Sequence, residues 1–322
     1  MAVVAAVIFA VLPSSTNPTG QNSNEVYGQP TLTLVAPLVA SACTLNNTCL
    51  VVGSSSGDGT GVTVGEVATG STWQALSLPH SNSATFLGSS CWHSGCFIYG
   101  LTINGDLLWR YQATTNTVTA LTPPSPSPSV EGLSCFATSS CAVIDMGAGD
   151  SAPHFYVTTD AGSTWSTPVP TPFDATSLSC TSSQRCLATS TTSTWSTHDG
   201  GLTWAQSAHS TGGLINLVCF GSSCLARDSG ASHNQLWRTS DFGTSWTSTT
   251  LNGKNYALAC LSADRCVSAG ANHAVTGAIT RINGSSISAI PVNYFPNPIT
   301  TLACGTTRCV AGGLYSLALI KP

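Results

Sequence analysis

The chain of 322 residues carries only nine Lys plus Arg and thirteen Asp plus Glu, a charged fraction of 7%, against roughly 25% in an ordinary soluble domain. Seven Arg and two Lys, scattered singly, form no basic patch, which excludes a nucleic-acid binder. A hydrophobic content of 42% with little charge excludes a disordered chain, and no apolar run reaches the ~18–20 residues of a bilayer-spanning helix.

The chain opens with a continuous apolar run at residues 2–12, inside an N-terminal segment 1–13. This run is too short to span a bilayer and lacks the basic start of a complete signal peptide. Two alternatives stay open: the remnant of a signal sequence, or a retained anchor that attaches the protein to a membrane or a homo-oligomeric assembly. Residues 14–30 are predicted to form a polar linker, and the folded domain is expected over residues 31–322.

Fourteen cysteines follow in seven close pairs whose members are five or six residues apart. The pairs are Cys43 and Cys49, Cys91 and Cys96, Cys135 and Cys141, Cys180 and Cys186, Cys219 and Cys224, Cys260 and Cys266, and Cys304 and Cys309. Successive pairs begin 39–48 residues apart, a period typical of propeller blades or helical repeats. Segments rich in Ser, Thr, Val and Gly disfavour helices, and the flanks of each pair resemble two short strands joined by a tight turn.

A cysteine at each end of a hairpin brings the two Cβ atoms within disulfide distance, so we expect one hairpin disulfide per repeat. Zinc-knuckle and haem-attachment spacings are absent, and we expect no metal and no cofactor. The disulfides imply an extracytoplasmic location: secreted, periplasmic or cell surface. Asn46 and Asn283 lie in N-glycosylation sequons, and residues 122–129 resemble a short O-glycosylated stretch. Chance occurrence in a Ser- and Thr-rich chain is the alternative.

A second motif lies between the cysteine pairs, in three full copies at residues 158–165, 197–204 and 239–246. Its key residues are Asp160, Gly162 and Trp165, then Asp199, Gly201 and Trp204, then Asp241, Gly243 and Trp246. The Asp and the flanking Thr hydrogen-bond backbone amides of a turn, and the Gly takes a conformation that a side chain would obstruct. The Trp buries a large apolar face. The motif is therefore predicted to fasten a hairpin and not to catalyse.

This motif resembles the Asp box, or bacterial neuraminidase repeat, with the pattern S/T-x-D-x-G-x-T-W. Residues 31–322 resemble the seven-bladed Asp-box propellers, among them the photosystem II assembly-factor family, sortilin-type receptors and the propellers of some xyloglucan-degrading glycosidases. The resemblance implies an all-β fold: a seven-bladed β-propeller of four-stranded antiparallel blades, with the boxes on the outer rim. The chain ends before a fourth strand of the last blade, so an N-terminal strand at residues 31–35 is expected to close the ring.

The sequence offers few candidates for chemistry, and we assign no catalytic residue. Arg185, Arg265 and Arg308 each precede the second cysteine of a pair, which explains them as equivalent turn positions without the arginine set of a sialidase. Asp145 and Asp150 form the one close acidic couple outside the boxes, and we interpret them as a solvated turn. Trp92, inside a cysteine hairpin, is a candidate exposed aromatic for stacking on a sugar or a protein.

We therefore expect a non-enzymatic, extracytoplasmic binding or structural surface protein with a protein or glycan partner. The alternative is a polysaccharide-acting glycoside hydrolase or lyase of the Asp-box propeller type, which would need two carboxylates converging in a cleft. With thirteen acidic residues in 322, stability is expected to fall little in acid.

Overall fold

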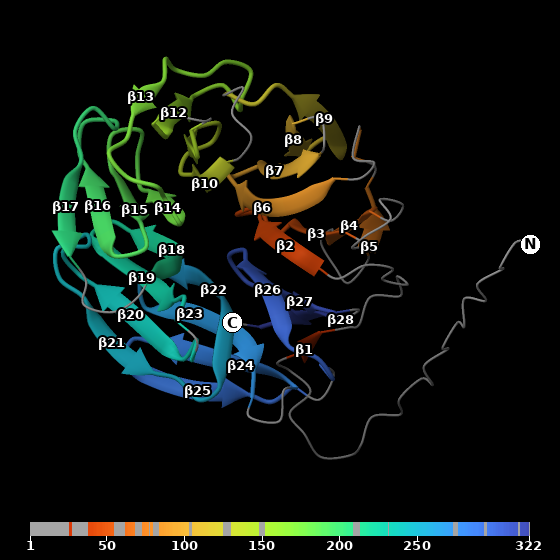
Figure 1. Ribbon diagram of the computed structural model, residues 1–322. Coiled ribbons are helices and arrows are strands. Elements are labelled where there is room, and N and C mark those ends of the chain that lie inside the picture. Colours follow the sequence, from red (N-terminus) through yellow and green to blue (C-terminus); the bar gives the residue numbers. More distant parts are fainter. Residues whose placement is uncertain are drawn as a thin grey trace, which may run out of the picture.

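The computed structural model describes residues 26–27, 38–54, 62–67, 73–76, 78–79, 84–102, 105–124, 130–147, 152–208, 213–230, 232–272, 276–292, 295–314 and 316–321. The described strands form seven four-stranded antiparallel sheets arranged around a central axis (Figure 1). The protein is thus an all-β propeller, and we number the sheets as blades 1–7 in chain order. Within the described part of the chain, no helix has the length and apolar character needed to cross a bilayer.

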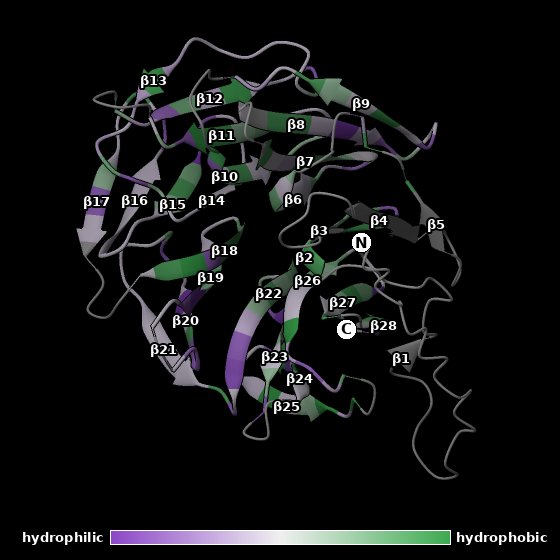
Figure 2. Cartoon of the chain, turned by 45° about the vertical axis from the view of Figure 1, so that its right-hand side comes forward, coloured by the Kyte–Doolittle hydropathy of each residue, from purple (hydrophilic) through white to green (hydrophobic). Residues whose placement is uncertain are grey.

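Blades 1–6 run from an inner to an outer strand in sequence order, whereas blade 7 has β1 as its outermost strand (Figures 1 and 2). Blade 1 contains β2 (Leu38–Cys43), β3 (Cys49–Ser54), β4 (Val62–Val67) and β5 (Trp73–Ala75), and blade 2 contains β6 (Thr85–Cys91), β7 (Gly95–Thr102), β8 (Gly105–Gln112) and β9 (Thr117–Leu121). Blade 3 contains β10 (Val130–Cys135), β11 (Cys141–Asp145), β12 (His154–Thr158) and β13 (Val169–Pro170), and blade 4 contains β14 (Ser177–Cys180), β15 (Cys186–Thr189), β16 (Ser193–Thr197) and β17 (Ala205–Ala208). Blade 5 contains β18 (Leu214–Phe220), β19 (Ser223–Asp228), β20 (Gln235–Thr239) and β21 (Thr247–Thr250), and blade 6 contains β22 (Lys254–Ser262), β23 (Arg265–Ala271), β24 (Gly277–Asn283) and β25 (Ser286–Ile290). Blade 7 contains β26 (Ile299–Cys304), β27 (Cys309–Gly313), β28 (Ser316–Ile320) and β1 (Val26–Tyr27).

Blade 7 combines one strand from the N-terminal part of the chain with three strands from its C-terminal part. Strand β1 pairs antiparallel with β28, with Val26 opposite Ile320 and Tyr27 opposite Leu319. An N-terminal strand therefore supplies the outer edge of this blade, but it comes from the segment expected to be a linker. The expected closing strand at residues 31–35 lies outside the described residues. A two-residue strand shows no alternation of apolar and polar residues, which explains why the sequence pattern did not reveal it.

Each blade carries one hairpin disulfide between its first two strands. The two cysteines of every pair stand directly opposite each other, with Cα–Cα distances of 3.9–4.1 Å. The second cysteine of each pair is almost fully buried between blades, with an exposed fraction of at most 2%, whereas the first lies on the inner strand. Seven disulfides indicate an oxidising environment.

The core lies between neighbouring blades. One apolar cluster joins blades 6 and 7 through Val267, Ile279 and Ile299, and another joins blades 1 and 2 through Leu50, Ile98 and Trp109. Strands buried on both faces explain the runs of small apolar residues after each second cysteine.

The turns at residues 158–165, 197–204 and 239–246 share one hydrogen-bonding scheme, and we call them the Asp-box turns after the motif that they resemble. In the first, the Thr158 hydroxyl donates to Asp160 Oδ1 (2.8 Å) and accepts from the Gly162 amide (2.9 Å). The Thr164 amide and hydroxyl donate to the two carboxylate oxygens of Asp160, at 2.8 and 2.6 Å. The same bonds recur around Asp199 and Asp241.

These hydrogen bonds stabilise the ionised carboxylate, because each donor prefers a negative acceptor. They lower the pKa of Asp160, Asp199 and Asp241 from 3.8 to about 2, and the bond from the Thr or Ser side chain four residues later contributes most. Three carboxylates therefore titrate differently in the folded and unfolded chain. This contrasts with the expectation from composition alone that acid has little effect on stability.

The glycine of each Asp-box turn also makes a contact between blades. Gly201 has a φ of +87°, and a Cβ there would lie 2.5 Å from the Phe155 ring of blade 3. Gly162 and Gly243 pack in the same way on Phe97 and Leu187 of the blade before their own. Glycine is therefore needed for both its backbone conformation and its lack of a side chain.

Candidate functional site

The central channel forms a hollow with a volume of about 740 Å³. All seven inner strands line it: β2, β6, β10, β14, β18, β22 and β26. In Figure 1 these strands lie nearest the axis of the ring. The first cysteine of every pair lies at the end where the inner strands finish, and a mixed set of residues lies where they begin. We call that second end the channel mouth.

The channel mouth is shaped by β-bulges. In six of the inner strands the register shifts by one residue near the start of the strand. The extra residue stands four positions before the first cysteine in five of these strands, and it is Val39, Leu87, Glu131, Tyr256 or Thr300. In β18 it falls at 216–217. A bulge redirects the side chain of the extra residue, so these five blades each carry a chemically different group at this position. Four of the five residues line the channel: Val39, Leu87, Glu131 and Thr300.

The side chains at this position differ from one another in exposure and in hydrogen bonding. Val39 and Leu87, in adjacent blades, are both 41% exposed and both line the channel. Thr300 and Thr176 instead donate to backbone carbonyls of the following blades, Leu38 and Leu214, each at 2.9 Å. The two threonines therefore join blades, and the apolar pair is left facing the channel.

Glu131 is the only charged side chain among the described residues that line the channel. Tyr99 of β7 lies beside it and reaches the channel past Gly88, where a Cβ would be 2.4 Å from the phenol oxygen. Burial raises the pKa of Tyr99 to about 12, and the negative charge of Glu131 adds to this rise. The phenol is therefore protonated at neutral pH and can donate a hydrogen bond.

Arg227 of β19 approaches the mouth from blade 5. Its Nε donates to Oδ1 of Asn216, which has a left-handed φ of 51°, and its Nη1 donates to the Asp228 carbonyl at 3.4 Å. Burial lowers the pKa of Arg227 to about 10, opposed by the nearby Asp228, so the guanidinium remains charged at neutral pH. The mouth thus has a carboxylate on blade 3 and a guanidinium near blade 5.

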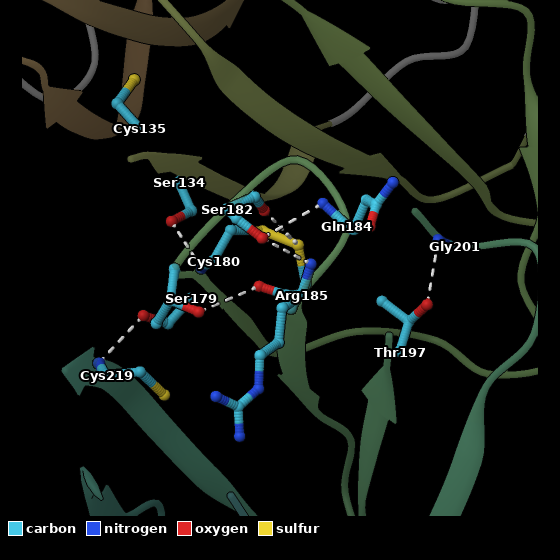
Figure 3. The surroundings of a disulfide bond; sticks show 12 residues. Ser134, Cys135, Ser179, Cys180, Ser182, Gln184, Arg185, Thr197, Gly201 and Cys219 are labelled. Atoms are coloured by element: carbon cyan, nitrogen blue, oxygen red, sulfur yellow. Dashed lines mark hydrogen bonds between the residues drawn. A yellow bond between two sulfur atoms is a disulfide. The ribbon is translucent and has the colours of Figure 1, made fainter. Parts of the chain in front are cut away.

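The opposite end of the channel is held together by serines that precede the first cysteine. Figure 3 shows Ser134 accepting a hydrogen bond from the Cys180 amide (2.8 Å), and Ser179 accepting one from the Cys219 amide (3.0 Å). Ser90 accepts from the Cys135 amide at 3.0 Å in the same way. These bonds join blades 2 to 5 in sequence and give this end a structural role.

Two expectations from the sequence are wrong in the structure. Trp92 is buried, with 4% of its surface exposed, and its ring packs edge-on against Phe97 with centroids 5.1 Å apart. Asp145 is also buried and is not part of a solvated turn. It accepts hydrogen bonds from the amides of His154 (2.7 Å) and Gly147 (3.1 Å) and from the Tyr156 hydroxyl (3.1 Å).

The other candidate residues from the sequence lie on turns, at junctions between blades or outside the described residues. Arg185 lies 4.2 Å from the centre of the Phe242 ring and donates to the Ser222 hydroxyl of blade 5 (3.1 Å). Asn46 is exposed on the hairpin turn after β2, and Asn283 is exposed at the end of β24. Their glycosylation stays a prediction. Asp150 and residues 1–13 and 125–129 lie outside the described residues. Among those that are described, no group of three His, Cys, Asp or Glu residues could hold a metal ion.

A second hollow of about 550 Å³ lies on the rim between blades 2 and 3. It is lined by Pro123 and Pro124 after β9 and by residues 162–166 of the first Asp-box turn. Trp165, which forms part of its wall, also packs in the cluster around Phe97. This hollow therefore follows from the packing of the turn on the preceding blade.

No protein-family model matches the chain, and no curated protein matches its sequence. Several solved structures resemble its fold. A structure of YCF48 bound to D1 peptide is 15% identical, with 95% of this chain and 99% of that chain covered and a TM-score of 0.65. YCF48 from Cyanidioschyzon merolae is 14% identical, with 92% and 98% covered and a TM-score of 0.63. The GH74 xyloglucanase from Xanthomonas campestris is 11% identical, with 88% of this chain but 52% of that chain covered and a TM-score of 0.61.

The three similar proteins differ in what their names say they do: one is bound to a peptide and another is a xyloglucanase. A similarity at such low identity shows a shared architecture and does not by itself show a shared site. The comparisons therefore agree with the strand pairing on one point, that the chain is a β-propeller of four-stranded antiparallel blades.

Proposed function

We propose that this chain is a non-enzymatic, extracytoplasmic binding protein, related to the Asp-box propellers, that binds a protein partner at the channel mouth. The observation that carries the proposal is the set of bulged residues there. A repeat that keeps its cysteines and core residues nearly constant presents a different side chain at this position in almost every blade. Variation at one structural position of a repeat suits recognition, because each blade can contribute its own contact.

The chemistry of the channel favours binding over hydrolysis. Glycoside hydrolysis ordinarily needs two carboxylates about 5–10 Å apart, and Glu131 is the only carboxylate among the described lining residues. The exposed pair Val39 and Leu87 is instead suited to an apolar contact. YCF48, a propeller of similar architecture, has been solved with a bound peptide, which supports a peptide or protein as the partner class.

Selection of random heptapeptides on the oxidised chain tests this proposal. We expect selected peptides to compete for one site and to lose at least about tenfold in affinity against Leu87→Asp, because a charge at an apolar contact must be desolvated. The matched control is Leu202→Asp, on the second Asp-box turn, where Leu202 is 72% exposed and outside the channel lining. Equal binding to both variants, or the release of sugars from a polysaccharide by the purified chain, would contradict the proposal.

A further inference from the structure

Among the described residues that line the channel, the only charged side chain is negative. Glu131 is a single carboxylate in a lining that otherwise consists of Ser, Thr, Asn, Tyr, Gly, Cys and apolar residues. In a cavity with low-dielectric walls a charge acts more strongly than on an open surface, and the walls focus its potential. A group that enters beside Glu131 is therefore favoured when it is cationic.

The neighbours of Glu131 define what surrounds such a cation. The Tyr99 phenol lines the channel beside Glu131, close enough for the negative charge of Glu131 to add to the rise in the pKa of Tyr99. A protonated tyrosine offers both a ring face and a hydroxyl to a cation. Leu87 and Val39 follow on blades 2 and 1, and the inner strands of blades 1, 2 and 3 are in contact in that order. The acidic position therefore has an exposed apolar surface on one side.

Blade 5 supplies the opposite charge. Arg227 holds the Asn216 side chain at the mouth, and among the described residues no carboxylate lies within 4 Å of its guanidinium. A basic group entering the mouth is repelled from this side and attracted to blade 3. The two charges thus fix the orientation of a ligand as well as its sign.

We infer that the channel mouth binds a basic side chain, Lys or Arg, of a protein partner at Glu131, while apolar residues next to it in the partner pack on Val39 and Leu87. This inference rests on the proposed binding function and specifies its ligand. A free small cation would leave the exposed apolar pair uncovered, whereas an extended segment fills more of a 740 Å³ channel.

The same heptapeptide selection gives the probe. Peptides that compete for the mouth should share a Lys or Arg, and replacing that residue by the neutral norleucine should weaken binding about tenfold to a hundredfold, the range of a charge-assisted hydrogen bond. The Glu131→Gln variant should bind the basic peptide more weakly than the wild-type chain does, by a similar factor. It should bind the norleucine peptide as well as the wild-type chain does. The two losses should therefore not add, because both changes remove the same contact.

Asp264→Asn is the matched control, since Asp264 is a 78%-exposed carboxylate on the hairpin turn of blade 6. It removes the same charge from the protein and should leave both affinities within about twofold. The norleucine comparison on the wild-type chain needs no variant, so it remains informative if Glu131→Gln folds poorly. Two results would overturn the inference while the binding function stands. One is that peptides which bind the mouth lack a basic residue. The other is that the Glu131→Gln variant prefers the basic peptide over the norleucine peptide as strongly as the wild-type chain does. Absence of any peptide at the mouth would overturn both.

Discussion

Replacing Ser134 by alanine tests whether the serines before the cysteines hold neighbouring blades together. Cys180 and Cys186 form a cross-strand pair with a Cα–Cα distance of 4.0 Å, the kind of pair that exchanges no backbone hydrogen bonds. The Cys180 amide therefore points away from β15, and Ser134 Oγ accepts its hydrogen bond at 2.8 Å (Figure 3). Ser134 is 8% exposed and Cys180 is 6% exposed, so water cannot easily replace the hydroxyl.

The magnitude follows from what the substitution leaves behind. Ser134→Ala leaves a buried amide without its acceptor, which costs about 1–3 kcal/mol of unfolding free energy. Ser90→Ala removes the corresponding bond to the Cys135 amide, but both residues there are partly exposed, so water can substitute and the cost should stay below about 1 kcal/mol. Ser248→Ala, on the exposed outer strand β21, is the control and should change stability by less than about 0.5 kcal/mol.

Urea unfolding with the disulfides intact, followed by tryptophan fluorescence, measures these differences. A propeller can unfold blade by blade, so the slope of the transition must be equal in all variants before free energies are compared. Hydrogen exchange of the Cys180 amide gives a local readout, and its protection should fall in Ser134→Ala alone. A Ser134→Ala variant within about 0.5 kcal/mol of wild type and with unchanged protection would refute the reasoning.

Three further outcomes are expected. In urea unfolding, Gly201→Ala should lower stability by more than Gly200→Ala. Both glycines have positive φ, but a Cβ at Gly201 meets the Phe155 ring at 2.5 Å, whereas at Gly200 the nearest atom is 3.4 Å away. Equal losses of unfolding free energy in the two variants would argue against the contact between blades. The melting temperature should hold above about pH 5 and fall as the pH drops from about 4 towards 2. The reason is that the folded pKa of Asp160, Asp199 and Asp241, about 2, lies below the unfolded value of 3.8. Asp→Asn at all three positions should flatten this fall in melting temperature, and an unchanged fall would exclude these carboxylates as its cause. Peptide mapping without reduction should recover seven disulfides, each within one hairpin, and any disulfide between blades would contradict the fold.

The repeat itself could be predicted from the sequence because its signals are local. A pair of cysteines five or six residues apart defines a hairpin, and an Asp-box turn defines the next one, whatever the rest of the chain does. The side chains of the mouth gave no such signal. A bulge adds a residue to one strand without changing the spacing of the cysteines, so Glu131 and Leu87 look like ordinary strand residues. Glu131 could have been singled out only as one of three glutamates in the chain.

The wrong expectation for Trp92 has a similar origin. A residue in the loop of a hairpin whose cysteines are five positions apart is ordinarily exposed. Gly95 leaves space for the indole, however, because a Cβ there would lie 2.4 Å from the ring. The ring therefore folds back onto Phe97. Asp145 was misjudged because its amide donors lie across the turn, up to nine residues away. Both outcomes depend on the direction of a side chain in three dimensions, which residue spacing alone does not determine.

The pairing of β1 with β28 determines how the ring responds to mechanical force. Because the two strands are antiparallel with Val26 opposite Ile320, the chain enters β1 and leaves β28 at the same end of the pair. A force that separates the flanking segments therefore loads the backbone bonds one after another, as in unzipping, and does not shear them together. The disulfides cannot resist this opening, since each lies within a single blade. Tension applied at the two ends should thus release the closing strand first and leave the cross-linked hairpins of every blade intact.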